Sequence, residues 1–210
     1  MPDTTVVLRD DDERYPHLLR DGWTVTARSW AARLDITPAR VSAWRASADR
    51  LPPHDTCRGL GAADVPAMLE LDAATAGDYP GSVATAHEPL TEGRACPTPA
   101  RRAFGVLDTD GRLVALTFVD VDGRKAEVDF TVVAPDRRGQ GLAVAVKAAS
   151  LLALARDGVT VVRTGGSADN GRILAANVAL GFRVDEHWLT LTAPETRTGG
   201  VEAAHAPQPR

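Results

Sequence analysis

The sequence has few cysteines and no excess of positive charge. Of its 210 residues, 24 are lysine or arginine and 28 are aspartate or glutamate, which gives a formal charge of −4. Proteins that bind nucleic acid by releasing counterions need a basic surface, so nucleic acid is not an expected partner. Cys57 and Cys96 fit neither a zinc spacing nor a disulfide framework, and we expect two free thiols.

Long apolar runs and metal-binding patterns are also missing. No stretch approaches the length of a membrane-spanning helix, and the acidic N-terminus lacks the basic and apolar regions of a signal peptide. The sequence therefore predicts a cytoplasmic protein with no membrane partner. His54, His87 and His187 form no helical metal pair, so we expect no metal.

The composition pattern divides the chain into three parts. Residues 1–50 are predicted to be an N-terminal extension, with a strand or bent hairpin over Trp23–Arg33 and a helix from Thr37 to Ala48. A loose similarity to the region around Gly181 also permits a degenerate half-repeat. Residues 51–193 form the main domain, and residues 194–210 lack a hydrophobic pattern and are expected to be a disordered tail.

The main domain is predicted to be an α+β fold with a mixed, mainly antiparallel sheet flanked by helices. Alternating strand and helix patterns follow one another along the chain. The expected strands are Cys57–Leu60, Phe104–Leu107, Leu113–Val121, Glu127–Val133, Val159–Arg163, Phe182–Val184 and His187–Thr192, and the expected helices are Asp64–Ala76, Gly139–Arg156 and Asp169–Leu180. The loop Gly77–Arg101 is too long to be a simple connection, so it is either disordered or functional.

The segment Val132–Ala143 carries the strongest chemical signal. It reads as a strand, a tight turn with Gly139 and Gly141, and the start of a helix. Glycines let backbone N–H groups approach an anion closely, and the positive end of the helix dipole adds to the attraction. The segment therefore indicates a pyrophosphate site, although two glycines alone could simply tighten the turn.

Two motifs in this order resemble the GNAT N-acetyltransferase family. Arg138-Gly-Gln-Gly-Leu-Ala143 follows a strand that ends in Val-x-Pro, as in the family's signature. Asn170 at a helix start, followed by Leu180-Gly181-Phe182, resembles the family's closing motif. The resemblance covers roughly Cys57 to Thr192, and it implies a GNAT-like sheet that binds acetyl-CoA as co-substrate.

The resemblance also implies roles for single residues. The amides of Gly139–Ala143 are expected to hold the coenzyme A pyrophosphate, Val132 and Val133 the pantetheine arm, and Asn170 a later part of the cofactor. The implied cofactor-binding residues are Val132, Val133, Arg138, Gly139, Gln140, Gly141, Leu142, Ala143, Asn170 and Asn177.

Glu127 and Asp129 are the predicted catalytic residues. Attack on a thioester needs a neutral amine, so a base near neutral pH is useful. Ala126-Glu127 resembles the position of a glutamate base in some family members. Strict alternation places Glu127, Asp129 and Thr131 on one strand face, where two carboxylates could hold a cation and raise one pKa by repulsion. A solvated polar strand face is the alternative.

The sequence lacks the tyrosine that serves as general acid in many members of the family it resembles. Many family members carry a tyrosine four residues before the Gly-Phe glycine, and here that position is Asn177. Asparagine cannot donate a proton as a general acid, although its amide can hydrogen-bond sulfur or pantetheine. Tyr79, Cys96 or water are the substitutes.

The predicted function is acetyl-CoA-dependent N-acetyl transfer to a primary amine, with a small-molecule metabolite or antibiotic as the first choice of acceptor. The alternatives are a protein N-terminus or lysine, and a non-catalytic acyl-CoA-binding module. Trp23, Trp30 and Trp44 either pack the N-terminal segment onto the domain or line a substrate pocket. A homodimer is left open as a further partner, because the sequence does not disclose the oligomeric state.

Overall fold

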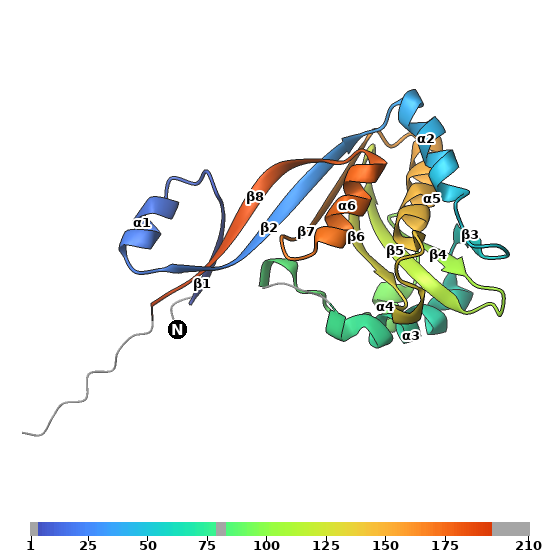
Figure 1. Ribbon diagram of the computed structural model, residues 1–210, viewed down its shortest axis with the longest axis horizontal. Coiled ribbons are helices and arrows are strands. Elements are labelled where there is room, and N and C mark those ends of the chain that lie inside the picture. The colour runs from blue at the N-terminus through green and yellow to red at the C-terminus, as the bar shows by residue number, and fades with distance from the viewer. Residues whose placement is uncertain (1–3, 79–82, 195–210) are drawn as a thin grey trace, which may run out of the picture.

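The computed structural model describes residues 4–78 and 83–194, and Figure 1 shows their arrangement. Strands and helices alternate through most of the chain. The strands are β1 (Thr5–Arg9), β2 (Thr24–Asp35), β3 (Thr56–Gly59), β4 (Arg101–Leu107), β5 (Leu113–Asp122), β6 (Lys125–Val133), β7 (Val161–Ser167) and β8 (Arg183–Thr192). The helices are α1 (Tyr15–Arg20), α2 (Pro38–Ala48), α3 (Val65–Thr75), α4 (Glu92–Ala95), α5 (Leu142–Arg156) and α6 (Gly171–Leu180).

All the strands of the described residues join one mixed sheet in the order β1-β8-β2-β7-β6-β5-β4-β3. The pairs are antiparallel except for β6 and β7, which run parallel. This confirms the predicted α+β class with a mainly antiparallel sheet. Short turns explain the meander β4–β6, because Gly111 and Gly123 take the positive φ that these turns need.

One prediction about the sheet is wrong. The segments Phe182–Val184 and His187–Thr192, predicted as two separate strands, fall in one continuous strand, β8, which begins at Arg183. The partner of β8 on one side is β2, which enters the sheet between β7 and β8 from the N-terminal part of the chain. No local turn is needed, because a strand distant in sequence supplies the missing hydrogen bonds.

The first fifty residues therefore share the sheet with the main domain. Strands from both sides of the predicted boundary near residue 50 pair along most of β2. Trp44 anchors α2: it is buried, and its Nε1 donates to the Leu180 carbonyl oxygen at 2.9 Å. Residues 195–210 of the predicted tail lie outside the described residues.

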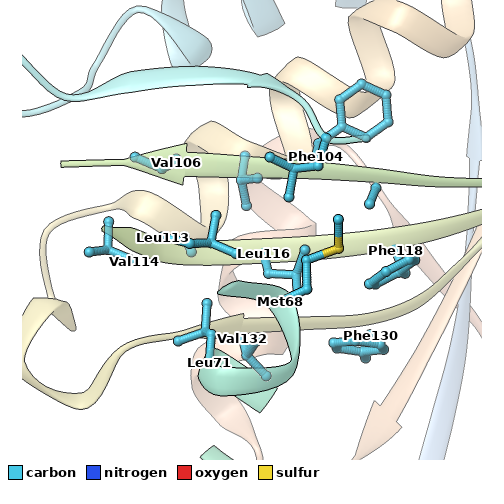
Figure 2. Close-up of a cluster of buried hydrophobic side chains, with 14 of the residues drawn as sticks. Met68, Leu71, Phe104, Val106, Leu113, Val114, Leu116, Phe118, Phe130 and Val132 are labelled. Atoms are coloured by element: carbon cyan, nitrogen blue, oxygen red, sulfur yellow. The ribbon is translucent and has the colours of Figure 1, made fainter. Parts of the chain in front are cut away.

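Helices cover both faces of the central sheet (Figure 1). Helices α2, α5 and α6 lie on one face, and α3 with α4 lies on the other. Figure 2 shows Met68 and Leu71 of α3 packed over Phe118, Phe130 and Val132. No helix of the described residues is long and apolar enough to cross a membrane.

Candidate active site

The glycine turn lies between β6 and α5, as the sequence predicted. Gly139 and Gly141 both have φ of 78°, a left-handed conformation that side chains rarely adopt, and Gly141 is the N-cap of α5. A Cβ atom at either glycine would meet nothing within 4 Å. The turn is therefore open on its outer side, where a ligand could approach the backbone.

The N–H groups at this turn are available to an anion. The first helical hydrogen bond of α5 runs from the Ala145 N–H to the Gly141 carbonyl oxygen. Within the described part of the chain, the N–H groups of residues 138–144 have no recorded acceptor. Such unpaired donors, together with the helix dipole, make a ready anion site.

A cavity of about 1010 Å³ opens in front of this turn. We call it the glycine-turn cavity. Its walls come from the end of β6, the start of α5 and one side of α6, and they include Val132, Val133 and Arg138. Strands β6 and β7 pair only from Lys125 to Glu127 on β6 and then separate, so the following β6 backbone faces the cavity without a β7 partner.

Arg138 is already held by protein groups. Its Nη2 lies 2.5 Å from the Asp78 carboxylate, and its Nε donates to the Val133 carbonyl oxygen at 3.2 Å. Asp78 also lines the glycine-turn cavity. An anion in this cavity would therefore compete with Asp78 for Arg138.

A second cavity, of about 780 Å³, lies on the α3 side of the sheet. We call it the acidic cavity, because Glu88, Asp120, Glu127 and Asp129 line it. Thr131, Asn170 and Ile173 line both cavities, so the two meet at these residues. A molecule in one cavity could reach a molecule in the other at this junction.

A β-bulge at Asp129 changes the predicted strand faces. Strand β6 pairs Val128 with Val119 and Phe130 with Phe118, which leaves Asp129 without a pairing partner on β5. Alternation therefore resets at this residue: Val128 packs with Leu151 of α5, whereas Phe130 packs with Met68 of α3. The predicted separation of Glu127 from Phe130 is wrong, because both lie on the α3 face, although Glu127 and Asp129 line the same cavity.

Asp129, one of the two predicted carboxylates, is held by arginine side chains. Arg101 binds Asp129 at 2.5 Å and Asp120 at 2.8 Å, and Arg94 lies 3.9 Å from Asp129. Burial disfavours the charge of Arg101, but hydrogen bonds to Asp129 and Asp120 outweigh it and raise its pKa. These arginines offset the charge of Asp129, so it has little repulsion to exert on a neighbour.

Glu127 remains as the carboxylate without a recorded partner. No hydrogen bond or ion pair of Glu127 is found among residues 4–78 and 83–194. Its side chain is exposed and lines the acidic cavity. Both predicted catalytic residues line the cavity, and Glu127 is the one without an ion pair recorded in the described residues.

Comparisons with known proteins bear on the fold of this chain. No family model matches the chain. It is similar to a mycothiol acetyltransferase of Clavibacter michiganensis subsp. michiganensis, with 35% identity over 140 residues, which are 60% of this chain and 46% of the relative. The chain thus spans about half the length of this curated relative.

Solved structures show the fold. The similar ones include a GCN5-related N-acetyltransferase from Sphaerobacter thermophilus, with a TM-score of 0.67, 16% identity and coverage of 89% of this chain and 58% of that one. Another is a tandem GNAT protein from the clavulanic acid biosynthesis pathway, with a TM-score of 0.64, 22% identity and coverage of 90% and 62%. This chain has the GNAT N-acetyltransferase fold.

The two asparagines expected to contact the cofactor in this GNAT fold differ in their surroundings. Asn170 lines both cavities, and its Oδ1 accepts a hydrogen bond from the Ile173 N–H at 3.2 Å. Asn177 is fully buried, lines neither cavity, and its amide atoms have no recorded partner among the described residues. The structure does not bring Asn177 to the surface on which the other expected ligands lie.

The substitutes for a general acid are not brought to the junction either. Cys96 is exposed and lines neither cavity. Tyr79 lies outside the described residues. Asn170 and the other residues at the junction carry no acidic proton, so the GNAT signature residues by themselves supply no proton donor there.

Sequence reasoning named Trp30 as a residue that either packs or lines a pocket, but it missed His87 and Trp188 of the acidic cavity. Trp30 reaches it from β2 and Trp188 from β8, while His87 reaches it from the loop predicted to be disordered or functional. Trp30 packs in the core and also lines the acidic cavity. Its side chain is 4% exposed, and its Nε1 donates to the Ser167 carbonyl oxygen. A sequence signal for His87 and Trp188 would have required knowing which segments the tertiary fold brings beside β6.

Proposed function

We propose that this chain transfers the acetyl group of acetyl-CoA to a primary amine. The observation that carries the proposal is the junction of the two cavities at Thr131, Asn170 and Ile173. One cavity offers unpaired backbone N–H groups for a pyrophosphate, and the other offers carboxylates for a cation. An amine and a thioester could meet at this junction.

The chain's own groups account for binding of the co-substrate. The N–H groups of residues 139–143 and the dipole of α5 would hold the pyrophosphate. The β6 backbone at Val132 and Val133, which has no β7 partner, would pair with the amides of the pantetheine arm. Arg138 would add a charge once it leaves Asp78. Binding in this way fixes the direction from which the thioester is presented.

Glu127 is proposed as the base that makes the amine nucleophilic. An ammonium group has no lone pair, so it must lose a proton before it attacks. Glu127 has no ion pair recorded in the described residues, because Arg163, its register partner on β7, is paired with Asp185 and Glu186, and the exposure of Glu127 lets a proton pass to water. Asp129 is proposed to hold Arg101 in place at the acidic cavity rather than to accept the proton.

A small amine is the proposed acceptor class. The acidic cavity has about 780 Å³, a size typical of small-molecule sites, and aromatic side chains from Trp30, Phe130 and Trp188 enclose part of it. A cation that bears apolar groups fits carboxylates and aromatic faces together. Acetylation of a protein N-terminus or lysine is the second candidate, because Glu127 itself is exposed.

The test is amine-dependent release of thiol from acetyl-CoA across small amines and peptides. Wild type should release thiol with a small cationic amine, and Glu127→Gln should lower kcat roughly 100-fold at pH 7 with acetyl-CoA binding unchanged. Glu70→Gln, an exposed glutamate of α3 outside both cavities, is the control. Acetyl-CoA binding without turnover of any amine would favour the non-catalytic module instead.

A further inference from the structure

Trp30 lies beside the junction of the two cavities. A Cβ atom at Gly166 of β7 would lie 2.9 Å from Trp30 Cζ2 and 3.5 Å from Ile173 Cγ2, so the indole ring and the Ile173 side chain meet over this glycine. Ile173 lines both cavities, whereas Trp30 and Gly166 line the acidic cavity. The indole ring therefore forms the part of the acidic cavity that borders the junction.

Hydrogen bonds hold the indole ring in this place. The Trp30 Nε1 donates to the Ser167 carbonyl oxygen at 3.2 Å, and the Asn170 N–H donates to the same oxygen at 3.1 Å. The Oδ1 of Asn170 in turn accepts the Ile173 N–H at 3.2 Å. Trp30 is thereby linked to Asn170 and Ile173, which both belong to the junction.

A glycine in β7 provides the space for this ring. Gly166 does not have a positive φ, so its backbone conformation does not require glycine. Glycine inside a strand costs stability, and it often marks a place where another group approaches closely. Here the approaching group is the indole ring, because a Cβ atom on Gly166 would be too close to Trp30 Cζ2.

The acyl group is the part of the co-substrate that would reach this ring. In the proposed binding mode the pyrophosphate lies at residues 139–143 and the pantetheine arm lies along Val132 and Val133, so the thioester arrives at the junction. The acyl group is attached to the sulfur and extends toward the acidic cavity. Ile173 and the indole ring offer it apolar surface, which suits a hydrocarbon chain.

The amine and the acyl group would use different parts of the acidic cavity. The carboxylates proposed to attract the amine come from β5, β6 and the segment before α4, whereas Trp30 comes from β2, on the other side of β7. An acyl chain against the indole ring therefore leaves Glu127 open to the amine.

We propose that Trp30 determines the length of the acyl group that the site accepts. This inference rests on the proposed acetyl transfer, and it names the donor as an acyl-CoA with a two-carbon acyl group. Each methylene beyond the acetyl methyl has to displace a ring that is 4% exposed and hydrogen-bonded. One methylene in an apolar pocket is worth about 10- to 200-fold, so wild type should prefer acetyl-CoA to butyryl-CoA by roughly 100-fold in kcat/KM.

Two substitutions change the space beside the junction in a compensating way. Trp30→Phe removes the part of the ring that contains Cζ2, which should lower the preference for acetyl-CoA at least about tenfold. Adding Gly166→Ala to Trp30→Phe places a methyl group where Cζ2 lay, and the preference should return to within about threefold of wild type. Trp44→Phe is the matched control: Trp44 is buried, its Nε1 also donates to a carbonyl oxygen, and it lines neither cavity.

Calorimetry measures the same preference without turnover. Acyl-CoA is titrated into the full chain with no amine present, and unacylated CoA is the reference. Butyryl-CoA should bind wild type at least about tenfold more weakly than CoA does, and this difference should largely disappear in Trp30→Phe. The acetyl-CoA and CoA dissociation constants should stay within about threefold of each other in both proteins.

The outcomes separate this inference from the proposed function. Wild type that binds and uses butyryl-CoA as well as acetyl-CoA would overturn the role of Trp30 and leave acyl transfer standing. An unchanged donor preference in Trp30→Phe, or an equal change in Trp44→Phe, would also overturn it, and a raised KM for the amine alone would assign the ring to the acceptor instead. Binding of CoA without thiol release for any amine would overturn the proposed function, and the calorimetric ratio would then decide the role of Trp30 in binding. No binding of CoA would overturn both.

Discussion

The two cavities of this protein are assembled from the chain in different ways. The glycine-turn cavity is built largely from two continuous stretches, residues 131–144 and 169–179, and much of its proposed chemistry comes from backbone N–H groups. The acidic cavity draws side chains from β2, the segment 84–88, α4, β5, β6, β7 and β8. A backbone site can be encoded locally, whereas a side-chain site needs the tertiary fold to gather it.

The largest effect is expected for Gly141→Glu, which tests whether the glycine turn binds the co-substrate. The substitution places a carboxylate and a strained φ in the turn that is proposed to hold the pyrophosphate, so acetyl-CoA binding should weaken more than about 100-fold by calorimetry. Gly111→Glu is the matched control, because Gly111 has φ of 79° in a turn outside both cavities. Equal weakening in both variants would mean that strain, not the site, is responsible.

The second test concerns two buried charged residues, Asp72 on α3 and Lys147 on α5. The buried Asp72 of α3 is paired with His87, whereas Lys147 on α5 is 1% exposed and, among the described residues, has only the Phe182 ring recorded beside its Nζ, at 5.6 Å. Burial lowers the pKa of Lys147 to about 7. The unfolded chain therefore binds more protons between about pH 7 and 10.5, and the free energy of unfolding should rise with pH in that window.

Lys147→Met removes this penalty. At pH 6.5 the variant should be more stable than wild type by about 2 kcal/mol in urea unfolding, and the difference should shrink toward zero as the pH approaches 10. Lys125→Met, a change at an exposed lysine on β6, is the control. A difference that does not depend on pH would show that packing, and not the buried charge, explains the result.

The third test asks whether the carboxylates of the acidic cavity are equivalent. Asp129→Asn should keep kcat within about threefold, because Asp129 is bound to Arg101 and is not the proposed proton acceptor. The acceptor's KM is expected to rise modestly as Arg101 loses one partner. A loss of kcat as large as that of Glu127→Gln would return Asp129 to the catalytic role that the strand pattern suggested.

The smallest expected effect is at Asp78. Asp78→Asn should free Arg138 and remove a negative charge from the glycine-turn cavity, which should tighten acetyl-CoA binding about threefold at low salt. The gain should diminish as salt is added. Asp35→Asn breaks a comparable exposed pair with Arg33 and should leave binding unchanged.

Prediction from sequence succeeded best where structure is local. The meander, helix α5 after the glycine turn and helix α6 with its Asn170 cap all lie within a few residues of their predicted bounds. Hairpin turns, caps and helical periodicity act between neighbouring residues, so their signals can be found in a short stretch of sequence. The roles of the predicted site residues stay predictions until the variants above are measured.

The sequence by itself determined the glycine turn, the α+β class and the order of the main-domain elements. Only the tertiary structure decided that β2 enters between β7 and β8, that a bulge resets the faces of β6 at Asp129, and that His87 reaches Asp72 from a long loop. Strand pairing over more than 100 residues and a one-residue bulge leave no periodic trace in the sequence, since the partner's backbone sets them. The acidic cavity depends on all three.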